Sequence, residues 1–194
     1  ELFNYLSGFS KQKSYQKLLV SPLSMREKFI FLIKREIKNA EEGKKAEIIA
    51  KMNSLVDPEI IKLLYFASDS GVKISLIIRG VCCLYPQRKN LSENIKVISI
   101  IGHFLEHSRI FWFCNNGNNE VFIGSADWMR RNLDRRIEAV TPIEDYELKS
   151  KIYSLLQTYI KDDYFSWTMN EDGSYTKHEL DSAKNRSQID LIEQ

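Results

Sequence analysis

The sequence lacks the long apolar runs and the strong charge bias that mark membrane-spanning and nucleic-acid-binding proteins. No segment of its 194 residues reaches the roughly 18 consecutive apolar residues of a membrane-spanning helix. The formal net charge is only +2, so a basic site has to come from local clustering of lysine and arginine. The contents of hydrophobic (43%) and charged (28%) residues are ordinary for a globular protein, and we expect one sizeable domain, alone or with an appendage.

Cysteine is also scarce, since only Cys82, Cys83 and Cys114 occur. Adjacent cysteines rarely pair with each other, and an odd count suits a reducing compartment better than a disulfide scaffold. The spacing of cysteine and histidine does not match a zinc site. The chain begins Glu1-Leu2-Phe3 with no initiator methionine and no basic segment, which disfavours a signal peptide and suggests a piece of a longer polypeptide.

Strand-like and helix-like segments alternate over the first part of the chain. Three apolar runs predict strands, at residues 17–21, 46–52 and 72–78. A first helix is predicted to begin after Ser24, because Ser24 and Glu27 match an S-x-x-E capping box. A second is predicted after Asp57-Pro58, which supplies a helix cap and a first-turn proline. This alternation is typical of an α/β fold with parallel strands.

The second half of the chain is predicted to add short strands and one more helix. The strands are expected at residues 95–101, 109–114, 120–125 and 135–141. The run Asn115–Asn119 predicts a hairpin turn, and residues 147–159 an amphipathic helix. We therefore expect an α/β fold with a mixed, largely parallel sheet flanked by helices over residues 1–165. Residues 166–194 are polar and rich in turn-forming residues, and we expect an irregular, partly mobile tail there.

Two segments carry residues suited to phosphate chemistry. His107 and Arg109 lie two positions apart before an apolar run, so on a strand they share a face. The imidazole would attack or donate a proton, and the guanidinium would hold anionic oxygens in a fork. Downstream, Gly124 and Ser125 would allow close backbone approach and offer a hydroxyl to the same phosphate. The alternative is a solvated loop histidine beside a surface arginine.

Arg79, Lys51 and Asn53 are further candidates for binding phosphate. Arg79 follows a predicted strand and precedes Gly80, where it would hold an anion or extend into solvent. Lys51 and Asn53 share one face of another predicted strand. Lysine neutralises phosphate charge and asparagine hydrogen-bonds to its oxygens; the alternative is a solvated Lys51.

Four of the seven residues from Arg130 to Arg136 are arginine, which resembles a track for a polyanion. Arg130 and Arg131, beside Trp128, are our candidates for contact with such a chain. Acidic residues at 134 and 138 can pair with the other arginines in a structural ion network. We treat His103 and His178 as ordinary surface residues.

The segments His107-Ser108-Arg109 and Gly124-Ser125-Ala126-Asp127 resemble the H-x-K and G-S-x-N motifs of the phospholipase D superfamily. Arg109 stands where lysine is usual and Asp127 where asparagine is usual, and both departures match the polyphosphate kinase branch. The likeness to that family covers most of residues 17–142. Its pieces include Lys51-Met52-Asn53-Ser54-Leu55-Val56-Asp57 and Phe104-Leu105-Glu106-His107-Ser108-Arg109.

The resemblance implies that residues 1–165 are the C-terminal, phospholipase-D-like catalytic domain of an enzyme that reversibly transfers the terminal phosphate of ATP to polyphosphate. In that family the phosphorylated histidine belongs to an earlier half of the polypeptide, so His107 is implied to act as general acid or base. His107 and Arg79 match residues that contact ATP. The resemblance also implies Mg²⁺, with ligands outside this fragment, and the remaining domains of the same polypeptide as partners.

DNA is not an expected partner, and the full-length enzyme is expected to be a homo-oligomer in the cytoplasm or peripheral to the inner membrane. The fragment alone is expected to fold but not to turn over ATP. Two alternatives stay open. One is a phospholipase-D-like phosphodiesterase or nuclease completed by homodimerisation. The other is a non-catalytic module that binds anions or nucleic acid through residues 130–136.

Overall fold

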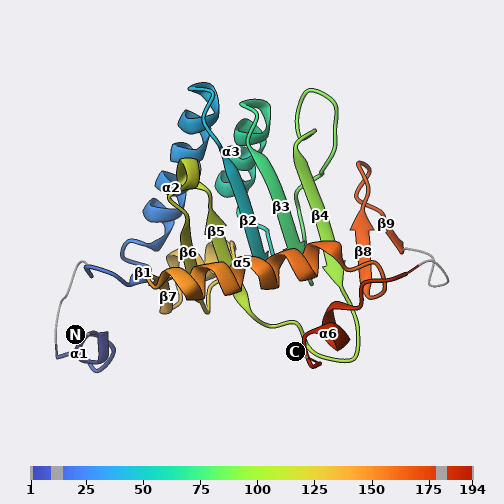
Figure 1. The fold of residues 1–194 in the computed structure, drawn as a ribbon. Helices are drawn as coiled ribbons and strands as arrows, with labels where there is room; N and C mark the ends of the chain where they lie inside the picture. The colour runs from blue at the N-terminus through green and yellow to red at the C-terminus, as the bar shows by residue number, and fades with distance from the viewer. Residues whose placement is uncertain (1, 10–14, 178–182, 194) are drawn as a thin grey trace.

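The computed structural model describes residues 2–9, 15–177 and 183–193 and is built around one sheet (Figure 1). In the described residues the sheet has nine strands in the order β1-β7-β6-β5-β2-β3-β4-β8-β9. The strands are β1 (Leu19–Ser21), β2 (Glu47–Met52), β3 (Lys73–Ile78), β4 (Ile95–Ile100), β5 (Arg109–Phe113), β6 (Glu120–Gly124), β7 (Glu138–Ile143), β8 (Ser166–Met169) and β9 (Tyr175–Lys177). The helices are α1 (Leu2–Leu6), α2 (Met25–Glu41), α3 (Pro58–Asp69), α4 (Arg130–Asp134), α5 (Tyr146–Lys161) and α6 (Ser187–Asp190), with a 3-10 turn η1 (Asn115–Gly117).

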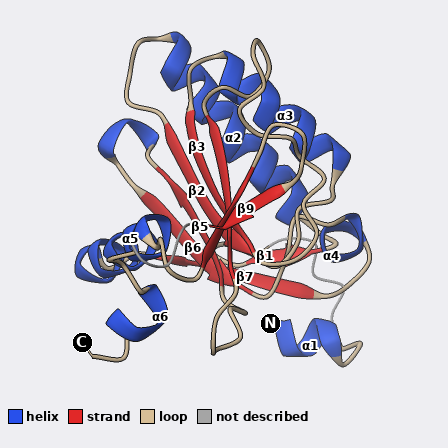
Figure 2. Cartoon of the chain, turned by 90° about the vertical axis from the view of Figure 1, so that its right-hand side faces the viewer, coloured by secondary structure: helices blue, strands red, loops and turns tan. Residues whose placement is uncertain are grey.

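Helices cover both faces of the sheet, as expected for this fold class. Figure 2 shows α2 and α3 on one face and α5 on the other. Alternate side chains of the central strands point to opposite faces of the sheet. Ile48 and Ala50 of β2 pack on the face covered by α2 and α3, whereas Ile49 packs with Leu156 of α5 on the other face. Both faces of β2 are therefore buried, which explains its apolar run Ile48-Ile49-Ala50.

The expected mixed sheet is confirmed, but the expectation that it is largely parallel is wrong. Only the pairs β2–β3 and β3–β4 are parallel. The other six pairs among the described strands are antiparallel. Parallel neighbours need a long crossover such as α3, whereas β5, β6 and β7 follow one another through shorter connections and reverse direction each time. The strands downstream of β4 therefore return alongside β2 and β4 in the opposite sense.

The two main helices begin where the sequence predicted, but by different means. Asp57 caps α3, because its carboxylate accepts the Ile60 N–H at 3.1 Å. Ser24 precedes α2, yet its hydroxyl makes no capping hydrogen bond, so the predicted capping box is wrong. The predicted strand at 135–141 is displaced as well, since the short helix α4 occupies Arg130–Asp134 and β7 begins at Glu138.

The predicted irregular tail over 166–194 is wrong where the strands β8 and β9 and the helix α6 form. Strand β8 pairs with β4 and β9 pairs with β8, so the hairpin extends the sheet beyond β4. Met169 is only 4% exposed in the core, and the pairing covers backbone groups that would otherwise lie open on β4. His178 lies outside the described residues. None of the helices in the described part of the chain has the length and apolar character needed to cross a bilayer.

Candidate functional site

The candidate site lies at the edge of the sheet where the parallel strands β2 and β3 end. Asn53 follows β2 and Arg79 follows β3 at this edge. Strand β5 is antiparallel to β2, with Ile110 opposite Lys51, so Arg109 at the start of β5 reaches the same edge. Gly124 at the end of β6 pairs with Arg109 and brings the segment after β6 there too. The topology therefore gathers four separate pieces of sequence along one edge.

A chain of hydrogen bonds links the polar residues at this edge. Arg79 donates to Asn53 Oδ1 from Nε (3.1 Å) and Nη2 (2.9 Å). The backbone N–H of Asn53 donates to Asp127 Oδ1 at 2.9 Å, and the same oxygen accepts from Arg109 Nε at 3.1 Å. The alternative of Arg79 extending freely into solvent is thus wrong, because Asn53 holds its guanidinium at the edge of the sheet.

His107 lies on the loop between β4 and β5, and its side chain is exposed. Its carbonyl oxygen accepts a hydrogen bond from Arg109 Nη1 at 2.7 Å, which fixes the backbone of His107 to the guanidinium. Its imidazole makes no hydrogen bond to any residue that the structure describes. The two residues are therefore joined through the backbone of one and the side chain of the other, and the imidazole is available to a substrate.

Lys51 is buried, and the alternative of a solvated lysine is wrong. Its side chain is 2% exposed and its Nζ lies 3.0 Å from Glu106 Oε2, donates to Ser108 Oγ at 2.8 Å and lies 4.8 Å from the centre of the Tyr159 ring. Burial lowers the pKa of Lys51, although the Glu106 carboxylate opposes that effect. The ammonium group is thus engaged with the residues on either side of His107.

Ser125 and Arg130 do not join this network. The Ser125 hydroxyl donates to the Glu138 carboxylate and accepts from the Ala139 N–H at 3.3 Å, so it is bonded to β7. A Cβ at Gly124 would collide with the Ala139 carbonyl oxygen, so this glycine serves close packing of β6 on β7. Arg130 is 77% exposed, and its Nε lies 3.9 Å from Asp134.

Arg26 is a residue of this region that the sequence did not single out. Its guanidinium binds Asp57 at 2.6 Å, Glu59 at 3.0 Å and Asp134 at 2.6 Å. The hydrogen bonds that it donates to the carboxylates of Asp57 and Asp134 raise its pKa. Arg26 therefore fastens the arginine-bearing helix α4 to α2 and α3, and Asp134 belongs to the structural ion network that the sequence suggested.

Glu106, Tyr159 and Gln188 were missed as well. Glu106 adjoins His107 and lies in a segment that carries the family resemblance, so its position in the sequence could have identified it as a residue of the site. Tyr159 and Gln188 reach the site only through the packing of α5 and α6 and left no signal in the local sequence.

The site does not offer a set of magnesium ligands. Among the described residues, no group of three or more histidine, cysteine, aspartate or glutamate side chains is placed to hold a metal ion. The two carboxylates at the site are already paired, Asp127 with Arg109 and Glu106 with Lys51. The residues of this chain therefore do not fit Mg²⁺, and we assign them no step that involves it.

Residues 18–188 match the family described as polyphosphate kinase C-terminal domain 2. A polyphosphate kinase of Parasynechococcus marenigrum (strain WH8102) is 57% identical over all of this chain, which covers 28% of that protein. The crystal structure of polyphosphate kinase from Porphyromonas gingivalis superposes with a TM-score of 0.93 at 40% identity, over 99% of this chain and 30% of that one. The phospholipase D family member Nuc from Salmonella typhimurium shares the fold, with a TM-score of 0.52 at 16% identity over 83% of this chain and 97% of that one.

Proposed function

Because the chain belongs to the polyphosphate kinase C-terminal domain 2 family, we propose that it forms one wall of a cleft for reversible transfer of the ATP γ-phosphate to polyphosphate. The chain spans less than a third of the length of the polyphosphate kinases described above, so we assign the rest of the cleft to other parts of a longer polypeptide. A phosphohistidine intermediate is assigned there too. The catalytic domain proposed here comprises residues 1–165 together with the β8–β9 hairpin and α6.

The observation that supports the proposal is that Arg79, Arg109 and the backbone of His107 meet at one edge of the sheet, while the His107 imidazole is exposed and makes no hydrogen bond to the described residues. Arg79 is held by Asn53, and Arg109 is held by Asp127 and by the His107 carbonyl. Phosphoryl transfer depends mostly on positioning and on stabilising charge that spreads over the transferred group. Fixed guanidinium groups supply both, because they bind anionic oxygens in a defined geometry.

Each candidate residue receives a proposed role except Ser125, whose hydroxyl is bonded to β7. His107 donates a proton to, or accepts one from, the reacting phosphate and contacts the nucleotide, because its imidazole is exposed and unbonded. Arg79 binds the phosphates of ATP, and Arg109 holds the reacting group beside His107. Asn53 orients Arg79, and Arg130 contacts the polyphosphate chain from the exposed surface of α4. Lys51 acts from inside the fold by holding Glu106 and Ser108.

The proposal is tested with His107→Ala and Arg79→Ala in the full-length enzyme, with His103→Ala as the matched control. His103 lies on the same loop, is exposed, and packs edge-on against Phe165 at 5.6 Å. We expect ATP-dependent polyphosphate synthesis to fall by about 10²–10⁴-fold in His107→Ala, the range for loss of a general acid or base. His103→Ala should keep the parent activity. Equal activity in the two histidine variants would exclude the assigned role.

The isolated chain should not turn over ATP, because the residues that complete the cleft are proposed to lie elsewhere. Polyphosphate synthesis by the isolated chain would contradict this. Hydrolysis of a generic phosphodiester that His107→Ala abolishes would favour a homodimeric phosphodiesterase instead. Salt-dependent binding of DNA and polyphosphate alike, unaffected by His107→Ala, would favour a non-catalytic module.

We further propose that the full-length enzyme is a cytoplasmic homo-oligomer, or one peripheral to the inner membrane, that uses ATP and ADP. DNA is not proposed as a substrate. Sedimentation of the full-length enzyme in the presence and absence of polyphosphate measures the oligomeric state directly.

A further inference from the structure

The loop that carries His107, residues 101–108, has little structure of its own. It connects β4 to β5 along the lower edge of the sheet in Figure 1. Most of its side chains face solvent, including Phe104 (57% exposed) and Leu105 (68% exposed). Among the described residues, no backbone hydrogen bond joins two residues of this loop to each other. Its position therefore has to be set by contacts with other elements.

The side chain of Gln188, on α6, holds the middle of this loop. Its Oε1 accepts the Phe104 N–H at 3.0 Å, and its Nε2 donates to the Phe104 carbonyl oxygen at 2.8 Å. The same Nε2 donates to Glu106 Oε1 at 2.8 Å. Gln188 is 4% exposed, so these bonds are shielded from water. One amide thus satisfies both backbone groups of Phe104, as a neighbouring strand would.

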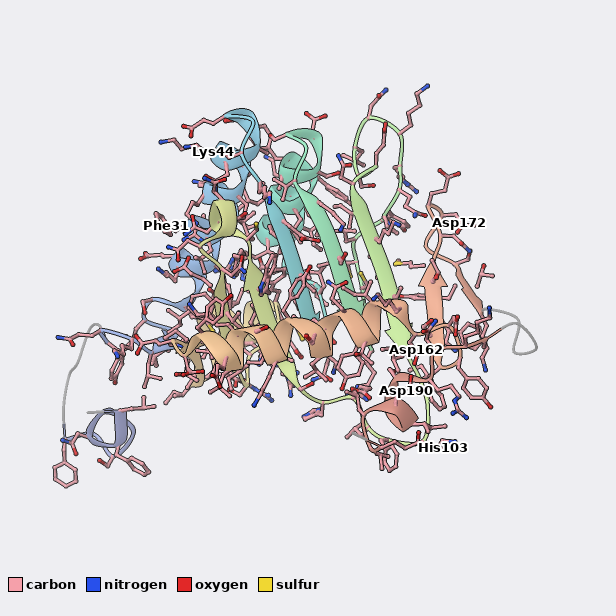
Figure 3. The ribbon with its side chains drawn as sticks, in the orientation of Figure 1. Phe31, Lys44, His103, Asp162, Asp172 and Asp190 are labelled. Atoms are coloured by element: carbon pink, nitrogen blue, oxygen red, sulfur yellow. The ribbon has the colours of Figure 1, made fainter. Side chains whose placement is uncertain are left out.

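Gly102 independently shows how closely the loop approaches α6. A Cβ at this position would collide with Gln188 Oε1 and with the ring of Phe165. In the view of Figure 3, His103 of this loop, Asp190 of α6 and Asp162, which follows α5, all lie in the lower right part of the molecule. The absence of a side chain at residue 102 is therefore required for the loop to lie against the C-terminal segment.

Helix α6 is itself held firmly, so it can act as a support. Ser187 is fully buried, and its N–H donates to Asp162 Oδ2 at 2.7 Å. The other oxygen of Asp162 accepts hydrogen bonds from the N–H groups of three successive residues that lead into β8, Tyr164, Phe165 and Ser166. Asp162 is 4% exposed and joins α5, β8 and α6 in one junction.

The other side of the loop is held by Lys51. Glu106, which Gln188 contacts through one oxygen, pairs with Lys51 through the other at 3.0 Å. Lys51 also donates to Ser108 at 2.8 Å. Both sequence neighbours of His107 are thus fixed, Glu106 by α6 and β2 together and Ser108 by β2. Each contact limits where the imidazole of His107 can lie.

We infer that residues 183–193 form a C-terminal latch that positions His107, with Gln188 as the positioning residue. The latch holds the loop at Phe104 and Glu106, and its release would let the imidazole leave the edge of the sheet where the arginines lie. The catalytic part of this inference rests on the proposed function, whereas the structural part, that the latch orders the loop, does not.

The test uses Gln188→Ala in the full-length enzyme, with Gln157→Ala as the matched control. Gln157 is half-buried on α5, and its side chain makes no hydrogen bond to the described residues. Hydrogen exchange of the peptide covering residues 101–108 should be about fivefold faster at the Phe104 amide in Gln188→Ala, because that amide loses its acceptor. Gln157→Ala should exchange as the parent does. Unchanged exchange in Gln188→Ala would overturn the latch.

Kinetics separates positioning from a general loss of stability. Gln188→Ala should lower kcat for polyphosphate synthesis by about 10- to 100-fold, the effect of misplacing a catalytic group by about 1 Å. In the double variant with His107→Ala, Gln188→Ala should cause no further loss, because it acts through His107. A further loss of the same factor in that background would overturn the positioning role.

Two further arms cover the remaining outcomes. If Gln188→Ala does not fold, Gly102→Ala displaces the loop from the latch without removing the Gln188 side chain and should give the same faster exchange. Parent-like exchange in that variant would also overturn the latch. If His107→Ala alone leaves synthesis unchanged, the proposed function fails, and the exchange data still decide whether the latch orders the loop.

Discussion

Replacing Asp127 with asparagine and with alanine should separate the charge of this carboxylate from its hydrogen bonds. Asp127 Oδ1 accepts from both the Asn53 N–H (2.9 Å) and Arg109 Nε (3.1 Å). An asparagine at 127 keeps an oxygen in that place, so it can retain both bonds and loses only the negative charge. An alanine loses both bonds and leaves the guanidinium without its carboxylate.

The expected magnitudes follow from the burial of the pair. The side chains of Arg109 and Asp127 are only 13% and 9% exposed. At 3.1 Å the Coulomb attraction is about 5 kcal/mol for an effective dielectric constant of about 20, before the cost of removing both charges from water. Asp127→Ala should therefore lower the free energy of unfolding by about 3–5 kcal/mol, as when one partner of a buried pair is removed. Asp127→Asn should cost about 1–2 kcal/mol, because a charged hydrogen bond becomes a neutral one.

The assay is urea unfolding of the 194-residue chain in a double-mutant cycle with Arg109→Lys. Lysine at position 109 lacks the planar guanidinium with its several N–H donors, so it cannot donate to Asp127 and to the His107 carbonyl in the same geometry. The coupling between Asp127→Asn and Arg109→Lys should lie at about 1–3 kcal/mol, as for residues in direct contact. A coupling near zero, or equal effects of asparagine and alanine at position 127, would refute the reasoning.

Three further changes test other parts of the fold. Burial alone would raise the pKa of Asp57, but the hydrogen bonds that it accepts from Arg26 and from the Ile60 N–H lower the pKa on balance. The contribution of Asp57 to stability is therefore present above about pH 4 and is lost as the pH falls through the lowered pKa. Below pH 4, the urea midpoint of Asp57→Asn should depend less steeply on pH than that of the parent. Burial raises the pKa of Glu36, so the contribution of this carboxyl group to stability is present below about pH 4.5 and is lost as the pH rises through the raised pKa. Between pH 5 and pH 8, the free energy of unfolding of Glu36→Gln in the same assay should therefore rise relative to that of the parent. Gly124→Ala should lower the free energy of unfolding by about 1–3 kcal/mol, because the added Cβ meets the β7 backbone; a thermal midpoint equal to the parent's would contradict this packing.

Local signals in the sequence located most of the helices and strands, but they did not predict how all of the strands pair with one another. Asp57-Pro58 marked the start of α3 because a cap and a first-turn proline act within a few residues. The direction of β5, β6 and β7 depends instead on which strand still has an unpaired edge for them to join. Residues near these strands in the sequence do not determine that choice. The hairpin β8–β9 was missed for a related reason: its sequence is polar and short, and it becomes strand by pairing with the open edge of β4.

The site shows the same division. The sequence singled out Arg79, Asn53 and Arg109 from their positions beside predicted strands. In the structure they lie at one edge of the sheet, because the carboxyl ends of parallel strands and the start of a neighbouring antiparallel strand meet there. The sequence could not show that the Ser125 hydroxyl turns to β7, since this depends on where Glu138 lies across the sheet. The burial of Lys51 was equally hidden, because its partners Glu106 and Tyr159 are far away in the chain.

The pairing of Arg109 with Asp127 and of Lys51 with Glu106 also bears on how long an anion stays at this edge of the sheet. Asp127 competes with an incoming anion for Arg109, so binding of the anion there exchanges one ion pair for another, whereas the buried pair of Lys51 and Glu106 stays in place. Counting Lys51, Arg79 and Arg109 against Glu106 and Asp127 leaves a net charge of one positive unit. This net charge attracts an anion, and the Asp127 carboxylate pairs with Arg109 again when the anion departs. An anion at this edge of the sheet should therefore dissociate faster than it would from the same cations without carboxylate partners.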